Sequence, residues 1–255
     1  MPPGAPPPHT TETATAAATA TKMQSRSRIL LEALVASALV TAAVAAAARL
    51  PERFVAFSVG GAFLFATWVL VWRKDDATVQ RYGLAFGGLV LPGRLDPREV
   101  LSHGLAAAKW ALGFALVTFP LFFFGWRFYW APSLRFSLET HALTFLNLAL
   151  GQVAVIALPE EAFYRGYLQT RLGEAFEKKV RIAGAELGFE LLLASLIFAL
   201  GHVATIRNPG RLAVFFPALL FGFLRARTGG VGAGVMYHAM CNLWSEALGR
   251  GYGLY

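Results

Sequence analysis

Long apolar segments alternate with short polar connections along almost the whole chain. A helix needs about 20 apolar residues to cross a bilayer, and most of these segments approach that length. Pro120 and Pro217 lie inside two of them, where we expect a kink or a short break. The pattern predicts an all-α polytopic membrane protein in which seven or eight transmembrane helices form one bundle. The seven predicted spans are residues 29–48, 54–72, about 103–125, about 141–165, about 187–206, about 212–224 and 231–248.

Composition favours the same class of protein. Of the 255 residues, 56% are hydrophobic and 15% are charged, whereas a soluble domain has about a quarter charged residues. Mean hydropathy is +0.52. Residues 1–22 are low-complexity Pro/Ala/Thr sequence, which cannot form a packed core. We therefore expect a disordered cytoplasmic tail over residues 1–28 and a transmembrane helical domain over residues 29–255.

The net charge of +8 does not indicate a nucleic-acid partner, because the lysines and arginines lie in the short connections between apolar segments. That distribution fits membrane topology and contact with a lipid bilayer. With Lys109 and Arg165 set aside, 14 basic residues fall on one predicted side and 7 on the other. The richer side should be cytoplasmic, which places the N-terminus in the cytoplasm. The Ala/Arg/Gly-rich composition and the Pro-rich tail favour a bacterial source, and hence the bacterial cell membrane.

Ionisable side chains inside the apolar segments are few, and most lie in the second half of the chain. Such residues are rare in membrane helices and are functional candidates by default. Glu161 and Arg165 are four residues apart, so they can pair on one helix face and partly neutralise each other. Glu160 lies about 100° further round the helix and is left free to face another group.

Two other segments carry side chains of interest at the same spacing of four. Phe198 and His202 lie on the fifth segment, and His238 and Asn242 lie on the seventh. A free carboxylate, two imidazoles and an amide could thus converge from three helices. This set suits hydrolysis, because a carboxylate can activate water while imidazole and amide N–H groups stabilise an oxyanion.

Each of these features also has a structural explanation. Pro159 could begin an interfacial helix, and the two adjacent glutamates would then favour its positive N-terminal end. A single histidine such as His202 is more often packed and hydrogen-bonded than catalytic. The polar pair on the seventh segment could link helices by hydrogen bonds. No single residue decides between these interpretations.

The polar groups occur in a specific order: EEAFYR at residues 160–165, FALGH at 198–202 and HAMCN at 238–242. This series of EExxxR, FxxxH and HxxxN resembles the CAAX-protease and bacteriocin-processing (CPBP, Abi-type) family of intramembrane glutamic endopeptidases, which is related to the type II CAAX prenyl endopeptidases. Each motif alone is weak evidence, whereas all three in this order on apolar helices are specific. The resemblance covers about residues 140–250, and the first half of the chain adds little to it.

The resemblance implies peptide-bond hydrolysis inside an all-helical membrane fold. By position, Glu160 corresponds to the glutamate that activates water, and His202 corresponds to the histidine that assists it. His238 and Asn242 correspond to the residues that stabilise the oxyanion. The other motif positions, which we assign to organising the site, are Glu161, Arg165 and Phe198.

The resemblance implies no obligatory metal, so we expect no cofactor. Zinc bound through Glu160, His202 and His238 stays open as an alternative, because two histidines and a glutamate form a common ligand set. The chain lacks an HExxH motif. Its one cysteine, Cys241, excludes an intramolecular disulfide and disfavours cysteine-based metal or redox chemistry.

The expected substrate is a membrane-associated protein or peptide, including proteins with a C-terminal membrane anchor. Two other classes stay open: a non-proteolytic scaffold or bacteriocin-immunity protein that retains the motifs, and an ion-coupled transporter that uses the buried glutamates. No internal repeat is visible, which disfavours transporter folds built from duplicated halves. In straight helices the motif residues would lie at different depths, so we expect tilts or helix breaks that let them meet.

Overall fold

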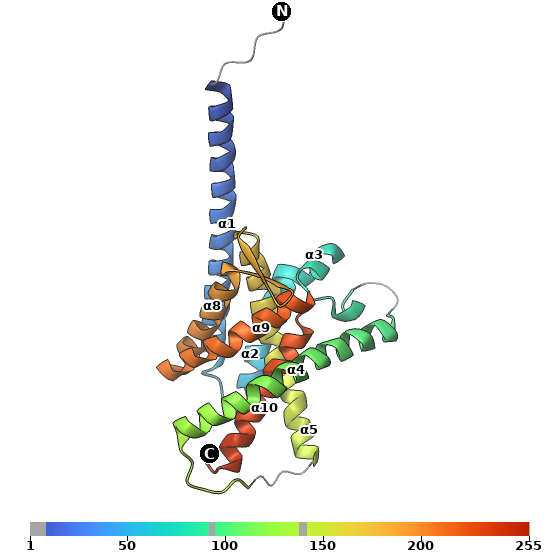
Figure 1. Cartoon of the computed structure of the whole chain (residues 1–255), viewed down its shortest axis with the longest axis vertical. Coiled ribbons are helices and arrows are strands. Elements are labelled where there is room, and N and C mark those ends of the chain that lie inside the picture. Colours follow the sequence, from blue (N-terminus) through green and yellow to red (C-terminus); the bar gives the residue numbers. More distant parts are fainter. Residues whose placement is uncertain (1–8, 92–94, 138–141, 255) are drawn as a thin grey trace, which may run out of the picture.

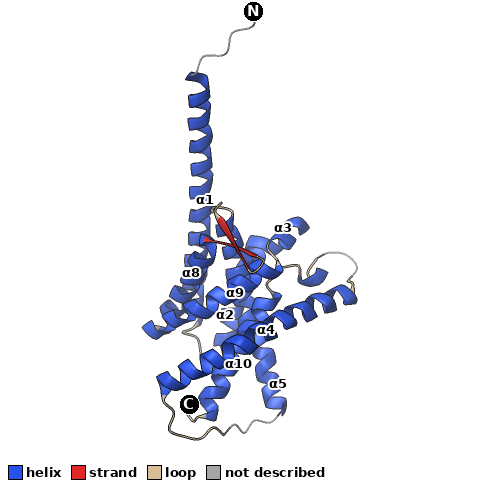
Figure 2. Cartoon of the chain, in the orientation of Figure 1, coloured by secondary structure: helices blue, strands red, loops and turns tan. Residues whose placement is uncertain are grey.

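The computed structural model describes residues 9–91, 95–137 and 142–254. These residues form an all-α polytopic membrane protein with one short β-hairpin (Figure 1, Figure 2). Within the described residues, six helices are long and apolar enough to cross a membrane. They are Met23–Ala47, Glu52–Trp72, Pro97–Trp130, Leu143–Gly173, Phe189–Ile206 and Pro209–Thr228.

The helices of the bundle follow the predicted order, with longer third, fourth and sixth members than the hydropathy pattern indicated. The seventh predicted span is a 20-residue helix that carries two of the motif residues, and it is not among the six apolar helices. Outside the motif region the elements are α1 (His9–Ala47), α2 (Glu52–Thr67), η1 (Trp68–Trp72), α3 (Asp76–Arg81), η2 (Phe86–Gly88) and α4 (Pro97–Trp130). The later elements are α8 (Phe189–Ile206), η5 (Pro209–Val214), α9 (Phe215–Thr228) and α10 (Gly232–Gly251).

The first helix begins earlier than expected. Residues 9–28, which we expected in a disordered tail, are part of α1, and residues 1–8 lie outside the described residues. Residues 13–21 consist of alanine and threonine, and alanine has the highest helix propensity of all residues. The N-terminal part of α1 extends beyond the bundle, and the C-terminus lies at the opposite end of the molecule (Figure 1).

The two internal prolines behave differently. α4 runs through Pro120 without interruption, so the expected break is absent at that position. Pro217 lies in the first turn of α9, directly after the 3₁₀ helix η5. The sixth span therefore changes from one helix type to another close to its proline.

A long helix with two irregular stretches carries the EExxxR motif. We call this segment, residues 142–173, the motif helix. Two of its stretches are π-helical, and the rest are α-helical. Its parts are α5 (Ala142–Gly151), the π-helical η3 (Gln152–Ala157), α6 (Leu158–Glu161), the π-helical η4 (Ala162–Gln169) and α7 (Thr170–Gly173).

The motif helix lies at the centre of the core. All eight residues of η4 are buried. Phe63 of α2 packs against Phe163 and Tyr164 with ring-centroid distances of 5.8 and 5.5 Å. Gly60 lets α2 approach even more closely, because a Cβ atom there would lie 2.6 Å from the carbonyl oxygen of Val155. A core of this kind holds the motif residues away from lipid and in fixed positions.

A β-hairpin, which the hydropathy pattern did not predict, joins the motif helix to α8. Strand β1 (Lys179–Ile182) pairs antiparallel with β2 (Ala185–Gly188). The two residues of the connecting turn, Ala183 and Gly184, both have positive φ. A type I′ turn requires this geometry, and it favours hairpin formation.

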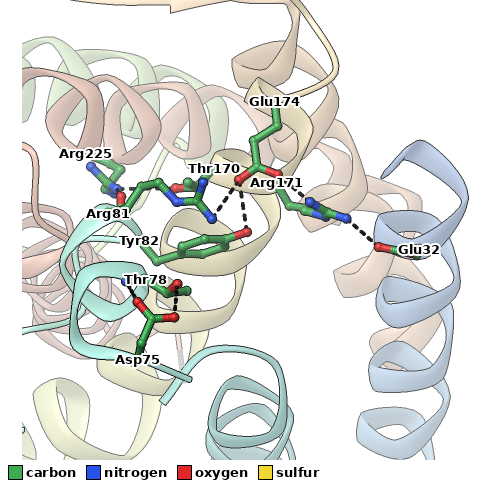
Figure 3. A network of polar contacts seen from close by, with 9 residues as sticks. All are labelled: Glu32, Asp75, Thr78, Arg81, Tyr82, Thr170, Arg171, Glu174 and Arg225. Atoms are coloured by element: carbon green, nitrogen blue, oxygen red, sulfur yellow. Dashed lines mark hydrogen bonds and ion pairs between the residues drawn. The ribbon is translucent and has the colours of Figure 1, made fainter. Parts of the chain in front are cut away.

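At the C-terminal end of the motif helix, charged side chains form what we call the helix-end network (Figure 3). Arg171 forms ion pairs with Glu174 and with Glu32 of α1. The other oxygen of Glu174 lies 3.3 Å from the Tyr82 hydroxyl and 3.4 Å from Arg81. The network therefore ties α1 and the segment after α3 to the motif helix.

Candidate active site

Three helices bring the motif residues together. The motif helix supplies Glu160, Glu161 and Arg165, while α8 supplies Phe198 and His202, and α10 supplies His238 and Asn242. The expected irregularity takes the form of two π-helical stretches: one ends at Ala157, three residues before Glu160, and the other begins at Ala162, directly after Glu161. Single π turns change the phase of a helix without ending it, and they are frequent at functional sites.

Glu161 is the most enclosed acidic group of the site. Its side chain is fully buried, with Oε1 3.0 Å from His238 Nδ1 and Oε2 3.4 Å from Arg165 Nε. An ionised carboxylate can only accept hydrogen bonds, so Nδ1 of His238 carries the proton of this contact. Gly234 makes room for it, because a Cβ atom there would lie 3.2 Å from Oε2. Glu161 thus orients the His238 ring and pairs with Arg165, the pairing that the sequence spacing predicted.

Glu160 is in a different environment although it is the next residue. Its Oε2 atom lies 4.0 Å from His238 Nε2, beyond hydrogen-bonding distance. Among the described residues this oxygen has no hydrogen-bond partner, and the side chain is 12% exposed. Most buried polar atoms have partners, so an exception needs an explanation. Glu161 Oε2 also has no hydrogen-bond partner among these residues, but it lies 3.4 Å from Arg165 Nε, so the Glu160 carboxylate is the less engaged of the pair and the better placed to act on a further molecule.

Aromatic rings enclose the polar groups. The Phe221 ring of α9 stacks on His238 with centroids 4.6 Å apart and an interplanar angle of 12°. The Arg165 guanidinium lies 4.8 Å from the centroid of Phe198 and 5.6 Å from that of Phe221. Cation–π contacts of this type are strongest where water is excluded. The two phenylalanines hold the Arg165 guanidinium and the His238 ring in place.

His202 joins the site through Phe198. The two rings are 4.4 Å apart between centroids, and His202 Nδ1 lies 3.0 Å from the carbonyl oxygen of Phe198. A carbonyl oxygen accepts, so Nδ1–H is the donor of this bond and Nε2 is left as an acceptor. The spacing of four residues in FxxxH therefore allows Phe198 and His202 to contact each other directly.

Asn242 contacts Gln152, a residue outside the three motifs. Its Nδ2 atom donates to Oε1 of Gln152 at 2.9 Å. Gln152 is the first residue of η3, eight residues before Glu160. The motif spacing predicted neither Gln152 nor Phe221. The only signal for Gln152 in the sequence is an uncharged amide within the apolar run FLNLALGQVAVIALP, and for Phe221 the apolar sequence of α9 carries no signal.

Among the described residues, no group of three or more His, Cys, Asp or Glu side chains lies close enough together to hold a metal ion. Zinc through Glu160, His202 and His238 would need all three side chains around one point. The residues as arranged do not provide that geometry, so we derive no step of the reaction through a metal.

The fold and the site together define a class: a multi-pass membrane protein with a glutamate, histidine and asparagine site shared among buried helices. A sequence profile of the family described as type II CAAX prenyl endopeptidase Rce1-like matches residues 142–244, which contain all three motifs. The match confirms the resemblance to the CAAX-protease family and indicates a membrane protease of that general type. Searches of the curated proteins and of the solved structures found no match.

Proposed function

We propose that the chain is an intramembrane endopeptidase in which Glu160 activates a water molecule for attack on a peptide bond. The contrast between the two neighbouring glutamates carries this proposal. Glu161 has one oxygen hydrogen-bonded to His238 and the other 3.4 Å from Arg165 Nε, whereas Glu160 Oε2 lies 4.0 Å from His238 Nε2 and has no hydrogen-bond partner among the described residues. A general base needs such a free carboxylate within reach of a water molecule.

The reaction can be written with the side chains of the site alone. Glu160 takes a proton from water as the water oxygen bonds to the carbonyl carbon of the substrate, and the carbonyl becomes a tetrahedral oxyanion. When His238 is protonated on both nitrogens, its Nε2–H donates to the oxyanion while Nδ1–H stays with Glu161. A second donor is Nδ2–H of Asn242. Glu160 then passes its proton to the leaving nitrogen as the C–N bond breaks.

His202 and the aromatic rings have supporting roles in this proposal. His202 Nε2, which the Phe198 contact leaves as an acceptor, can accept a hydrogen bond from the attacking water. Phe198, Glu161 and Arg165 organise the site by holding the rings and the buried charges. Removing one oxyanion donor typically lowers turnover by about 10²–10³-fold.

The proposed substrate is a membrane-associated protein or peptide, including those with a C-terminal membrane anchor. The proposed location is the bacterial cell membrane, with the N-terminus in the cytoplasm. The family match supports a protein substrate and a lipid environment in general terms. The distribution of basic residues supports the orientation.

The test compares membrane proteomes of the native strain, a deletion strain and a strain that carries Glu160→Gln. Protein termini that appear only with the native protein identify cleavage products. We expect both altered strains to lose the same termini. If Glu160→Gln behaves like native while the deletion does not, the glutamate is structural and a scaffold or immunity role replaces the proposal. If no termini change, flux measurements in proteoliposomes test the transporter alternative.

The chain offers a matched control for this test. Glu246 lies on α10, outside the site, and its Oε1 forms an ion pair with Arg250 at 2.6 Å. Glu246→Gln makes the same chemical change without touching the site. We expect this variant to produce the native set of termini.

A further inference from the structure

One polar contact of the site lies outside every motif. Gln152 and Asn242 are partly buried and come from two different helices, and their amides meet at 2.9 Å. Asn242 lies one turn from His238 on α10, and Gln152 lies in the largely apolar run before Glu160. Burying an amide without a partner is costly, so each amide stabilises the buried position of the other.

The π turn of η3 explains how Gln152 reaches this position. In an uninterrupted α-helix, residues eight apart are turned by about 80° relative to each other. A π turn accommodates about one extra residue. Eight steps from Gln152 to Glu160 then act as about seven, which ends within about 20° of the starting direction. Gln152 and Glu160 therefore face the same side of the motif helix, about 10 Å apart along its axis.

Two residues of α10, one turn apart, contact the Glu160 and Gln152 regions of the motif helix. His238 meets the two glutamates, and Asn242, one turn further along α10, meets Gln152. The partner positions run backward along the motif helix as they run forward along α10, as expected for antiparallel helices. Two polar contacts thus fix the register of the two helices, one at each end of the site.

The contact also fixes the orientation of the Asn242 amide. An asparagine side chain has a donor end with two N–H groups and an acceptor end with an oxygen. Gln152 Oε1 takes one N–H of Nδ2. Among the described residues the second N–H on the same atom has no acceptor, so it can donate to a further group. If the amide turned over, its oxygen would face the developing negative charge instead and would repel it.

We propose that Gln152 is a positioning residue that holds the Asn242 amide with its donor end toward the reacting carbonyl. This role rests on the proposed proteolytic function, because it concerns the oxyanion of that reaction. Gln152 itself acts through Asn242 and needs no contact with the substrate. The contribution is a fixed amide orientation in the transition state, so it should affect kcat rather than KM.

The activity test uses four variants of the full chain, reconstituted in lipid with a substrate found from the proteome comparison. Gln152→Met keeps the side-chain length but removes the strong acceptor, and we expect kcat to fall about 10-fold with KM unchanged. Asn242→Ala should cost more, and the double variant should be no worse than Asn242→Ala alone, because the two side chains act as one unit. Gln152→Glu retains the acceptor and should recover part of the kcat lost in Gln152→Met.

A control variant separates positioning from general packing. Gln169 lies on the same helix and donates through Nε2 to the carbonyl oxygen of Gly222 at 3.0 Å, outside the site. Gln169→Met should lower thermal stability and leave kcat close to native. A native kcat in Gln152→Met, or fully additive effects in the double variant, would overturn the positioning role.

A spectroscopic test detects the Gln152–Asn242 contact without an activity assay. The chain contains three asparagines, Asn147, Asn208 and Asn242, so ¹⁵N-asparagine labelling gives only three side-chain amide signals. Gln152→Met should shift the Asn242 signals, and Gln169→Met should leave them in place. Unchanged Asn242 signals in Gln152→Met would refute the contact. If Glu160→Gln retained full cleavage, the proposed function would fail, and the amide signals would still show whether Gln152 holds Asn242.

Discussion

Two charged clusters on the motif helix differ in how completely their polar atoms are paired. In the helix-end network, both oxygens of Glu174 have partners, and Arg171 bridges two carboxylates at the surface of the bundle (Figure 3). In the candidate site, one oxygen each of Glu160 and Glu161 and all three guanidinium nitrogens of Arg165 have no hydrogen-bond partner among the described residues, although they are buried. Paired charges at a helix end hold elements together. Unpaired charges in a core are costly, and they are retained where chemistry needs them.

The largest expected difference in stability between the two clusters comes from replacing one arginine in each with methionine. Arg165→Met removes the partner of a buried carboxylate and should lower the free energy of unfolding by about 3–5 kcal/mol. Arg171→Met changes a partly exposed pair and should cost less than about 1 kcal/mol. Chemical unfolding of both variants in detergent measures the difference. Adding Glu161→Gln to Arg165→Met should restore part of the loss, and equal losses in the two arginine variants would contradict the distinction.

The second-largest effect is expected at Phe221, one of the aromatic rings that enclose the site. Phe221→Leu removes the ring that stacks on His238 and covers Arg165, while it keeps an apolar side chain in place. We expect a loss of about 1–2 kcal/mol in stability, since a ring contact is lost but little volume is. We expect the cleavage rate to fall by more than the loss of stability would explain, because the His238 ring is no longer held in one plane. Phe216→Leu, at an exposed phenylalanine of the same helix, is the matched control.

A smaller effect is expected in the helix-end network. Glu174→Gln weakens its contacts with Arg171 and Arg81, and partly exposed pairs contribute about 0.5 kcal/mol. The loss should shrink further as salt is added, because exposed charges are screened. Thermal unfolding at low and high salt measures both values. A loss as large as that of Arg165→Met would show that the network is not merely a surface contact.

The smallest effect concerns pH at the same network. Burial raises the pKa of Tyr82, and the nearby Glu174 carboxylate raises it further. The folded pKa lies above the unfolded value of about 10, so the neutral phenol stabilises the folded state fully below pH 10 and less as the pH rises through the folded pKa. The stability difference between native protein and Tyr82→Phe should therefore narrow above pH 10. A difference that stays constant from pH 8 to pH 11 would contradict this.

The sequence predicted the helical class, the three motif-bearing helices and the Glu161–Arg165 pair, because each depends on apolar length or on i,i+4 spacing. Gln152 and Phe221 could not be predicted by the same reasoning. A spacing argument assumes 3.6 residues per turn, and the π turn of η3 changes the face on which Gln152 lies. Phe221 looks like any other apolar residue of α9 until its neighbours on α8 and α10 are known.

The hairpin and the start of α1 show the limit of hydropathy as a guide. β1 and β2 have only four residues each and no long apolar run, so their pairing depends on the Ala183–Gly184 turn rather than on hydropathy. The Ala/Thr stretch at residues 13–21 lacks large apolar residues that could form a core, yet it is part of α1 and continues the helix that follows. Low complexity indicated the lack of a core but did not determine the local backbone conformation.

The most direct test of Glu160 as the general base measures turnover and unfolding together. Native protein, Glu160→Gln and Glu161→Gln would be reconstituted in lipid with a peptide taken from the cleavage products of the native strain. We predict that Glu160→Gln unfolds at the native temperature but loses turnover by at least about 10³-fold, whereas Glu161→Gln loses both stability and turnover. Native turnover in Glu160→Gln would contradict the central claim that this carboxylate activates the attacking water.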